Sequence, residues 1–140
     1  MPSFHIVVRA LPLAEVPLRR VEAAGVGRET LVVPPDLQAS PLYVSFEQAA
    51  KVLEAMPRLH FEPDGSFVWV SGTHDVEPWQ VDGNLYDRDE SLVAIDLKGT
   101  CTRGQLSQLL DVFRSEGREL MIEIVRDAVF VRETHFIESF

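Results

Sequence analysis

Glu62 and Glu123 are the two carboxylates in this sequence whose positions suggest shared chemistry. They lie 61 positions apart and occupy the same place in two similar stretches of the chain. Two carboxylates that meet in one cleft can bind a cation, or one of them can act as a general base with a raised pKa. The pair therefore defines a first candidate site, for which cation binding is favoured over catalysis.

The histidines and the single cysteine offer less for chemistry. His74 and His135 match at the same 61-position offset, and His60 precedes Glu62 by two residues. Their spacing fits no compact zinc motif, and Cys101 has no second cysteine in the chain. The sequence also lacks a glycine-rich phosphate loop, a nucleophile elbow and a metalloprotease motif. We therefore expect histidines at strand ends, a half-buried structural thiol, and neither a metal nor a cofactor.

The similar stretches are residues 58–74 and 119–135, which align without a gap. Identical residues occupy six of the 17 aligned positions, where average composition gives about one. The identical pairs are Leu59/Leu120, Glu62/Glu123, Val68/Val129, Val70/Val131, Thr73/Thr134 and His74/His135. Residues 29–33 match residues 90–94 at the same offset. The sequence thus predicts a single domain over residues 1–140 with an internal repeat, 1–74 and 75–140.

Each half of the chain reads as two strands, a helix and two further strands. The strands expected before the helices are residues 4–9, 29–33, 79–87 and 91–97, and a hairpin follows each helix. Capping boxes place the helix starts at Ser45 with Gln48 and at Thr102 with Gln105. The apolar stripes of the helices are Phe46, Ala49, Ala50, Leu53 and Met56, and then Leu106, Leu109, Leu110 and Phe113. We expect the helices to end at Pro57 and at Gly117.

Two segments fall outside this plan. Residues 11–28 form an insertion in the first half, within which residues 18–24 suggest a helical turn or two before Gly25. Residues 136–140 are expected to form a tail. The predicted fold is α+β: an antiparallel sheet from two repeated strand-strand-helix-strand-strand modules with pseudo-twofold symmetry, and helices on one face.

The hairpins predict which side chains face away from the helices. Asp64-Gly65 is typical of a two-residue turn, which would pair Glu62 with Phe67. Side chains alternate along a strand, so one face carries aromatic and charged residues together. On that face we expect His60, Glu62, Phe67, Trp69, Met121, Glu123, Phe130 and Arg132. A sheet face open to water is usually polar, so the insertion, a second subunit or a ligand should cover it.

The order of elements resembles that of two known groups of proteins. Strand-helix-strand-strand, repeated in a chain of this length, is similar to the gyrase-inhibitor-like effector-binding domains and to the SOUL-type haem-binding proteins. In those folds, two such modules pack about a pseudo-twofold axis and form a cleft. The resemblance covers the order of elements over most of the chain. It implies binding of a small molecule in a cleft, where a carboxylate such as Glu62 or Glu123 faces a cationic ligand.

Composition and charge narrow the function classes. The chain has 140 residues, one cysteine and a net charge of −9, which disfavours nucleic acid as a partner. It shows no signal peptide and no membrane span, so we expect a cytoplasmic protein. The leading hypothesis is a non-enzymatic binding module for a small neutral or cationic molecule, in a cleft on the sheet face opposite the helices. The alternative is a homodimeric interaction or regulatory subunit that uses the same face, and an enzyme ranks third.

Overall fold

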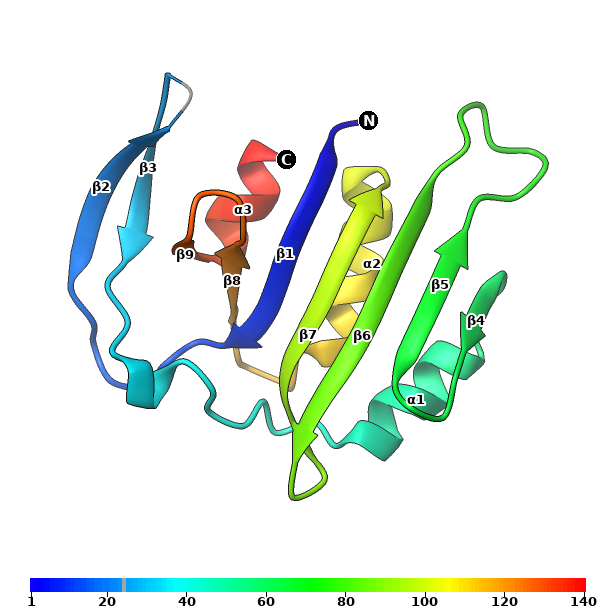
Figure 1. Ribbon diagram of the computed structural model, residues 1–140, viewed down its shortest axis with the longest axis horizontal. Coiled ribbons are helices and arrows are strands. Elements are labelled where there is room, and N and C mark those ends of the chain that lie inside the picture. Colours follow the sequence, from blue (N-terminus) through cyan, green and yellow to red (C-terminus); the bar gives the residue numbers. More distant parts are fainter. Residues whose placement is uncertain (24) are drawn as a thin grey trace.

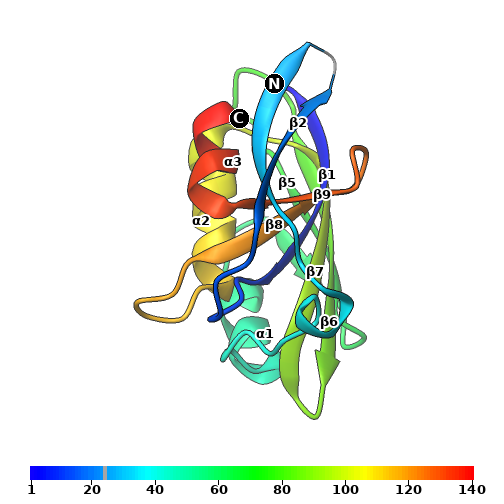
Figure 2. The ribbon, with the colours of Figure 1, turned by 90° about the vertical axis from the view of Figure 1, so that its left-hand side faces the viewer.

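The part of the chain that the structure describes forms a nine-stranded antiparallel sheet with three α-helices packed on one of its faces (Figure 1, Figure 2). The structure, a computed structural model, describes residues 1–23 and 25–140. The strands are β1 (Ser3–Ala10), β2 (Leu18–Ala23), β3 (Val26–Leu31), β4 (Leu59–Phe61), β5 (Ser66–Val70), β6 (Gln80–Arg88), β7 (Ser91–Thr100), β8 (Leu120–Ile124) and β9 (Val129–Arg132). The helices are α1 (Phe46–Glu54), α2 (Arg103–Phe113) and α3 (Glu133–Ser139), with a short 3₁₀ turn, η1, at Pro35–Leu37.

The strands follow the order β2-β3-β9-β8-β1-β7-β6-β5-β4 across the sheet, and all neighbours are antiparallel. The first strand, β1, therefore lies in the middle of the sheet between β8 and β7. The predicted α+β class and antiparallel sheet are confirmed.

Both predicted helix starts are confirmed. The Gln48 N–H donates to Ser45 Oγ over 3.0 Å, and the Ser45 N–H donates to Gln48 Oε1 over 2.9 Å. Thr102 and Gln105 form the same reciprocal pair at the start of α2. Each box satisfies two backbone N–H groups that have no partner within the helix. The boxes therefore set where each helix begins, using only contacts three residues apart.

The main core lies between the helices and the sheet. The four stripe residues of α2, Leu106, Leu109, Leu110 and Phe113, are fully buried. They belong to one cluster with Leu53 of α1, Phe136 of α3 and inward-facing side chains such as Ile6 and Val8 of β1. Burying a side chain of this kind contributes roughly 1.5–3 kcal/mol. The helix layer is thus attached to the sheet by apolar packing.

Three local predictions are wrong. Residues 18–23 form strand β2 instead of a helical turn, because they pair with β3 from Leu18↔Leu31 to Ala23↔Val26; residue 24 lies outside the described residues. Helix α2 ends at Phe113 instead of Gly117, because Arg114 adopts an extended backbone. The expected tail is helix α3, which buries Phe136 against the core.

The predicted twofold symmetry is not confirmed. The first hairpin joins the sheet through its second strand, since β5 pairs with β6 and β4 is an edge. The second hairpin joins through its first strand, since β8 pairs with β1. The two similar stretches therefore occupy different places in the sheet, one at its edge and one near its centre.

Candidate functional site

The first hairpin has a different register from the predicted one. The Gly65 N–H donates to the Glu62 carbonyl over 3.0 Å, and the Glu62 N–H donates to the Ser66 carbonyl over 2.9 Å. Gly65 has φ +94°, so the turn has three residues and ends in a left-handed glycine. Phe61 therefore pairs with Phe67, where the prediction paired it with Val68.

This one-residue difference moves two aromatic side chains to the other face of the sheet. Phe67 and Trp69 are each 3% exposed and lie in the main core on the helix side. Their predicted position on the opposite face was wrong, because a one-residue slip inverts every side chain of a strand. That face therefore lacks two of the three aromatic side chains that were expected to contact a ligand or a second copy.

The second hairpin keeps the predicted faces. Ile122 pairs with Val131 on the helix side, so Met121, Glu123, Phe130 and Arg132 face the other way. Met121 is fully buried there, in a small second cluster. Its neighbours in that cluster are Leu31, Val33, Leu11, Val16, Leu37 and Phe130. Leu11 and Val16 belong to the insertion, so the chain itself covers this end of the sheet.

The two glutamates do not meet in one cleft. Glu123 lies on β8 and Glu62 follows β4, five strands away in the sheet order, which corresponds to about 24 Å. Glu123 is paired with Arg9 of β1, whose Nε donates to Glu123 Oε1 over 2.9 Å. Glu62 and His60 are exposed at the far edge. Among residues 1–23 and 25–140, no group of three or more potential metal ligands comes together.

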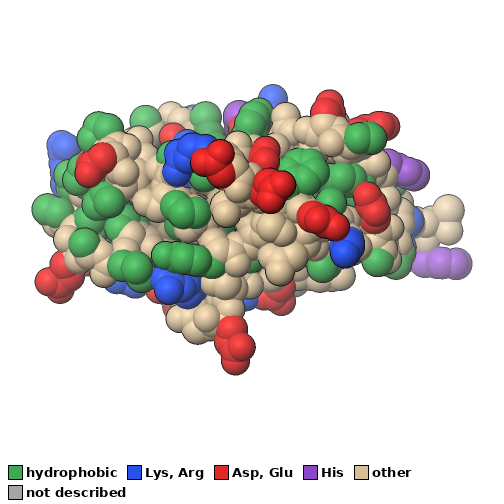
Figure 3. All heavy atoms as spheres, turned by 90° about the horizontal axis from the view of Figure 1, so that it is seen from below, with side chains coloured by type: hydrophobic (Ala, Val, Ile, Leu, Met, Phe, Trp, Pro, Cys, Tyr) green, Lys and Arg blue, Asp and Glu red, His purple; other side chains and the backbone are tan. Residues whose placement is uncertain are grey.

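A groove of about 960 Å³ lies between two walls that are far apart in the sequence. Figure 3 shows the molecule from below, where hydrophobic side chains are exposed among charged ones. One wall consists of residues 10–14, where β1 passes into the insertion, and of residues 37–43, which lead from η1 toward α1. The other wall consists of residues 115–120, between α2 and β8, together with Arg132. Arg132 is the one residue of these walls that the sequence placed in a candidate site. The groove itself was not predicted, because Tyr43 and Arg118 on its two sides are 75 positions apart.

The first wall is mainly apolar. It presents Leu11, Pro12, Leu13, Leu37 and Pro41, above a floor that includes the buried Leu42 and Leu120. Leu13 is 78% exposed, so its apolar side chain is open to water. It lies in a segment that contains several other apolar residues. Such a run of apolar residues and prolines in an irregular connection is the one signal by which the sequence marks this wall. These side chains give the groove its apolar character.

A contact between Tyr43 and Arg118 joins the two walls. The guanidinium carbon of Arg118 lies 4.2 Å from the centre of the Tyr43 ring. Tyr43 has φ +61°, a left-handed backbone that costs free energy for a bulky residue. The residue as a whole is still 59% exposed. The structure thus holds an aromatic face at the groove with a cation placed over it.

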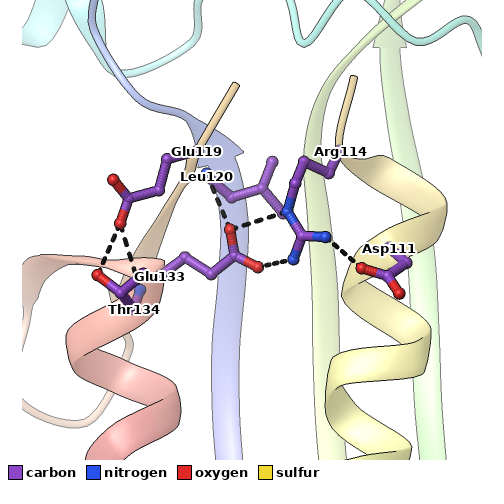
Figure 4. Close-up of polar contacts among 6 residues, drawn as sticks. All are labelled: Asp111, Arg114, Glu119, Leu120, Glu133 and Thr134. Carbon is purple, nitrogen blue, oxygen red and sulfur yellow. Dashed lines mark hydrogen bonds and ion pairs between the residues drawn. The ribbon is translucent and has the colours of Figure 1, made fainter. Parts of the chain in front are cut away.

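A cluster of polar side chains holds the second wall in place (Figure 4). Arg114, at the end of α2, forms a two-pronged ion pair with Glu133 at the start of α3 and also contacts Asp111. Glu133 is 5% exposed, and its Oε1 also accepts the Leu120 N–H over 3.2 Å. The hydrogen bonds that Arg114 donates to Glu133 raise the pKa of Arg114. A buried carboxylate is tolerated here because a cation and an N–H neutralise it.

Glu119 fixes the same wall to the start of α3. Its Oε1 accepts the Thr134 hydroxyl over 2.8 Å and the Thr134 N–H over 3.3 Å, and its Oε2 lies 2.9 Å from Arg132 Nη1. Partial burial raises the pKa of Glu119, but the hydrogen bonds from Thr134 and Arg132 outweigh that effect and lower it overall. Residues 114–120 are therefore anchored at both ends, while Arg118 between them reaches Tyr43.

No family model, no curated protein and no solved structure matches this chain. No helix within the described residues is long and apolar enough to cross a membrane. The features of this chain that bear on a function are therefore the groove and the contact between Tyr43 and Arg118.

Proposed function

We propose that the protein is a non-enzymatic binding module that holds a small, largely apolar molecule, neutral or cationic, in the groove between residues 37–43 and 115–120. The observation that carries this proposal is the Arg118 guanidinium over the Tyr43 ring. The groove takes the place of the sheet face opposite the helices, because Phe67 and Trp69 are core residues.

The size and lining of the groove support a small-molecule ligand. Its volume of about 960 Å³ is within the range of known ligand sites, which are mostly apolar with a few polar groups. Leu11, Leu13 and Leu37 supply apolar surface along one wall. Leu13 is 78% exposed and gains free energy when an apolar molecule removes it from water, whereas the half-buried Leu11 and Leu37 gain less.

The contact between Tyr43 and Arg118 supports a neutral or cationic ligand. The face of a tyrosine ring attracts cations, by roughly 0.5–1 kcal/mol at an exposed site. Arg118 shows that this face is accessible to a planar cation, and a ligand cation can replace it. The net charge of −9 also raises the local concentration of cations around the protein. A strained Tyr43 backbone is typical of positions where a side chain is held for binding.

The proposal can be tested by titration of the ¹⁵N-labelled protein, followed by NMR. Three probes share a benzyl or phenyl group and differ in charge: benzyltrimethylammonium, benzyl alcohol and phenylacetate. We expect benzyltrimethylammonium to shift the amide signals of Leu13, Tyr43 and Arg118, benzyl alcohol to do so more weakly, and phenylacetate least. Shifts that map to the open sheet face around His5 and Asn84, or no shifts with any probe, would contradict the proposal.

Two substitutions distinguish a cation site from an anion site. Tyr43→Ala should weaken binding of the cationic probe, and Tyr43→Phe should preserve it because the ring remains. Arg118→Ala should strengthen binding of the cationic probe, since the competing guanidinium is gone. If phenylacetate binds most tightly and Arg118→Ala abolishes its binding, the groove recognises anions instead and the proposal is wrong.

A further inference from the structure

Strand β2 ends the sheet with an unpaired edge. Its six residues pair with β3 on one side, from Leu18↔Leu31 to Ala23↔Val26, and no strand among the described residues pairs with it on the other. Figure 1 shows the β2–β3 hairpin as an arm at one end of the sheet. Leu18, Arg19, Arg20 and Glu22 are exposed. Such an edge offers backbone hydrogen-bonding groups to a further strand.

The hydrogen-bond pattern shows which residues offer these groups. The Val32 N–H donates to the Pro17 carbonyl over 2.8 Å, so Pro17 directs its carbonyl toward the β3 side. Residues in an antiparallel ladder alternate between inward and outward bonding. Arg19 and Val21 therefore bond toward β3, whereas Arg20 and Glu22 direct their N–H and carbonyl groups away from the sheet.

We propose that β2 pairs antiparallel with β2 of a second copy of this chain, about a twofold axis at Val21. In this register the outward groups of Arg20 bond to those of Glu22 of the second copy. The same contact occurs twice because the axis repeats it, which is typical of a closed homodimer. The two sheets then join into one continuous sheet.

Charge complementarity selects the second copy and the register. A twofold axis perpendicular to the sheet pairs side chains that lie on the same face. Because side chains alternate along a strand, the two paired residues are an even number of positions apart, and the axis therefore passes through a residue. An axis at Arg20 would place the two Arg20 side chains opposite each other. An axis at Val21 places Arg20 opposite Glu22 twice. Charged residues at an edge usually prevent strand pairing, but here they favour one symmetric pairing.

The free charges of Arg20 and Glu22 fit this arrangement. Within the described part of the chain, neither residue forms an ion pair. Gly27 lies opposite Glu22 in the hairpin and has no side chain there, which leaves room for Arg20: its guanidinium lies over Gly27. The Arg20 side chain lies on the same face as Glu22 but over β3, so pairing with Glu22 of the second copy would turn its guanidinium toward the free edge.

Sedimentation velocity of the full chain over a range of concentrations tests the proposal. We expect a concentration-dependent dimer for the unsubstituted protein. Arg20→Glu and Glu22→Arg should each raise the dissociation constant about tenfold or more, because two opposite-charge pairs become like-charge pairs. The double exchange, Arg20→Glu with Glu22→Arg, should restore the dimer. Arg19→Glu is the matched control: it makes the same charge change on the same strand, but position 19 lies on the opposite face of β2 from Arg20 and Glu22.

A second variant separates pairing from folding. Glu22→Pro removes the outward N–H, and proline is tolerated on an edge strand at such a position. We expect an unchanged circular dichroism spectrum with loss of the dimer. A monomer at the highest attainable concentration overturns the proposal, as does a dimer that survives both single reversals or a double exchange that fails to restore it.

Discussion

The ring of Phe67 on β5 lies over Gly83 on the neighbouring strand β6. A Cβ atom placed on Gly83 would be 2.1 Å from Cζ of Phe67, far closer than two carbon atoms can approach without bonding. Phe67 and Gly83 are paired across the two strands, and Val81 and Leu85 on either side are buried. The glycine thus provides the space that an aromatic side chain fills in the core.

We expect Gly83→Ala to destabilise the protein by about 2–3 kcal/mol, because overpacking a core forces side chains and backbone to move. Gly104→Ala is the control. A Cβ atom placed on Gly104 would have Thr102 Oγ1 as its nearest neighbour, at 3.9 Å, and alanine in place of glycine reduces the entropy of the unfolded chain. Urea denaturation of both variants measures the difference. Equal free energies of unfolding for the two variants would show that the position of Phe67 does not require a glycine at residue 83.

Substitution of Glu133 by Gln should destabilise the protein by about 2–4 kcal/mol, because it leaves the Arg114 guanidinium without its buried counter-charge. The matched control is Glu47→Gln, which removes an exposed ion pair with Lys51 at 3.6 Å and should cost less than about 0.5 kcal/mol. Thermal unfolding followed by circular dichroism compares the two. A loss for Glu133→Gln no larger than the control would show that the buried ion pair contributes little.

Glu119 should contribute a pH-dependent part of the stability. Its pKa is lowered below the ordinary value of 4.5 in the folded chain, so the folded state binds its proton less readily than the unfolded state. The stabilisation is therefore fully present above pH 4.5 and is lost as the pH falls through the folded pKa. Denaturant unfolding at a series of acidic pH values should show this loss. Glu119→Gln should reduce the change of the free energy of unfolding with pH. Glu116 is exposed on the same loop, so Glu116→Gln should leave this pH dependence unchanged.

The thiol of Cys101 should be unreactive in the folded protein. Cys101 is fully buried, and burial raises the pKa of its thiol to about 12. The reactive thiolate is therefore almost absent near neutral pH. A chromogenic disulfide reagent should label Cys101 only after the protein is unfolded in guanidinium. Fast labelling of the native protein would show that this part of the core opens readily.

Contacts close in sequence could be predicted from the sequence. The capping boxes at Ser45 and Thr102 each join residues three positions apart, so the local chemistry alone decides them. The buried stripe of α2 follows from helical spacing in the same way. The hairpin turn after residue 87 is another local feature. Asp89 and Glu90 adopt the left-handed backbone of a two-residue turn between Arg88 and Ser91.

The register of the first hairpin could not be predicted in this way. Asp64-Gly65 fits both a two-residue and a three-residue turn. The choice depends on where Phe67 and Trp69 can be buried. Burial of Phe67 needs the space over Gly83, and burial of Trp69 needs its packing against Trp79. Gly83 lies on β6 and Trp79 directly precedes it, so both contacts depend on a later part of the chain.

What the sequence determined by itself was the α+β class, the antiparallel pairing of neighbouring hairpins and the starts of both helices. Only the tertiary structure decided which strand of each hairpin joins the sheet, that residues 18–23 form an edge strand, and that Tyr43 and Arg118 meet across a groove. The physical reason is distance along the chain. Propensity, capping and turn chemistry act over a few residues, whereas strand order and groove walls depend on side chains that become neighbours only once the core has packed.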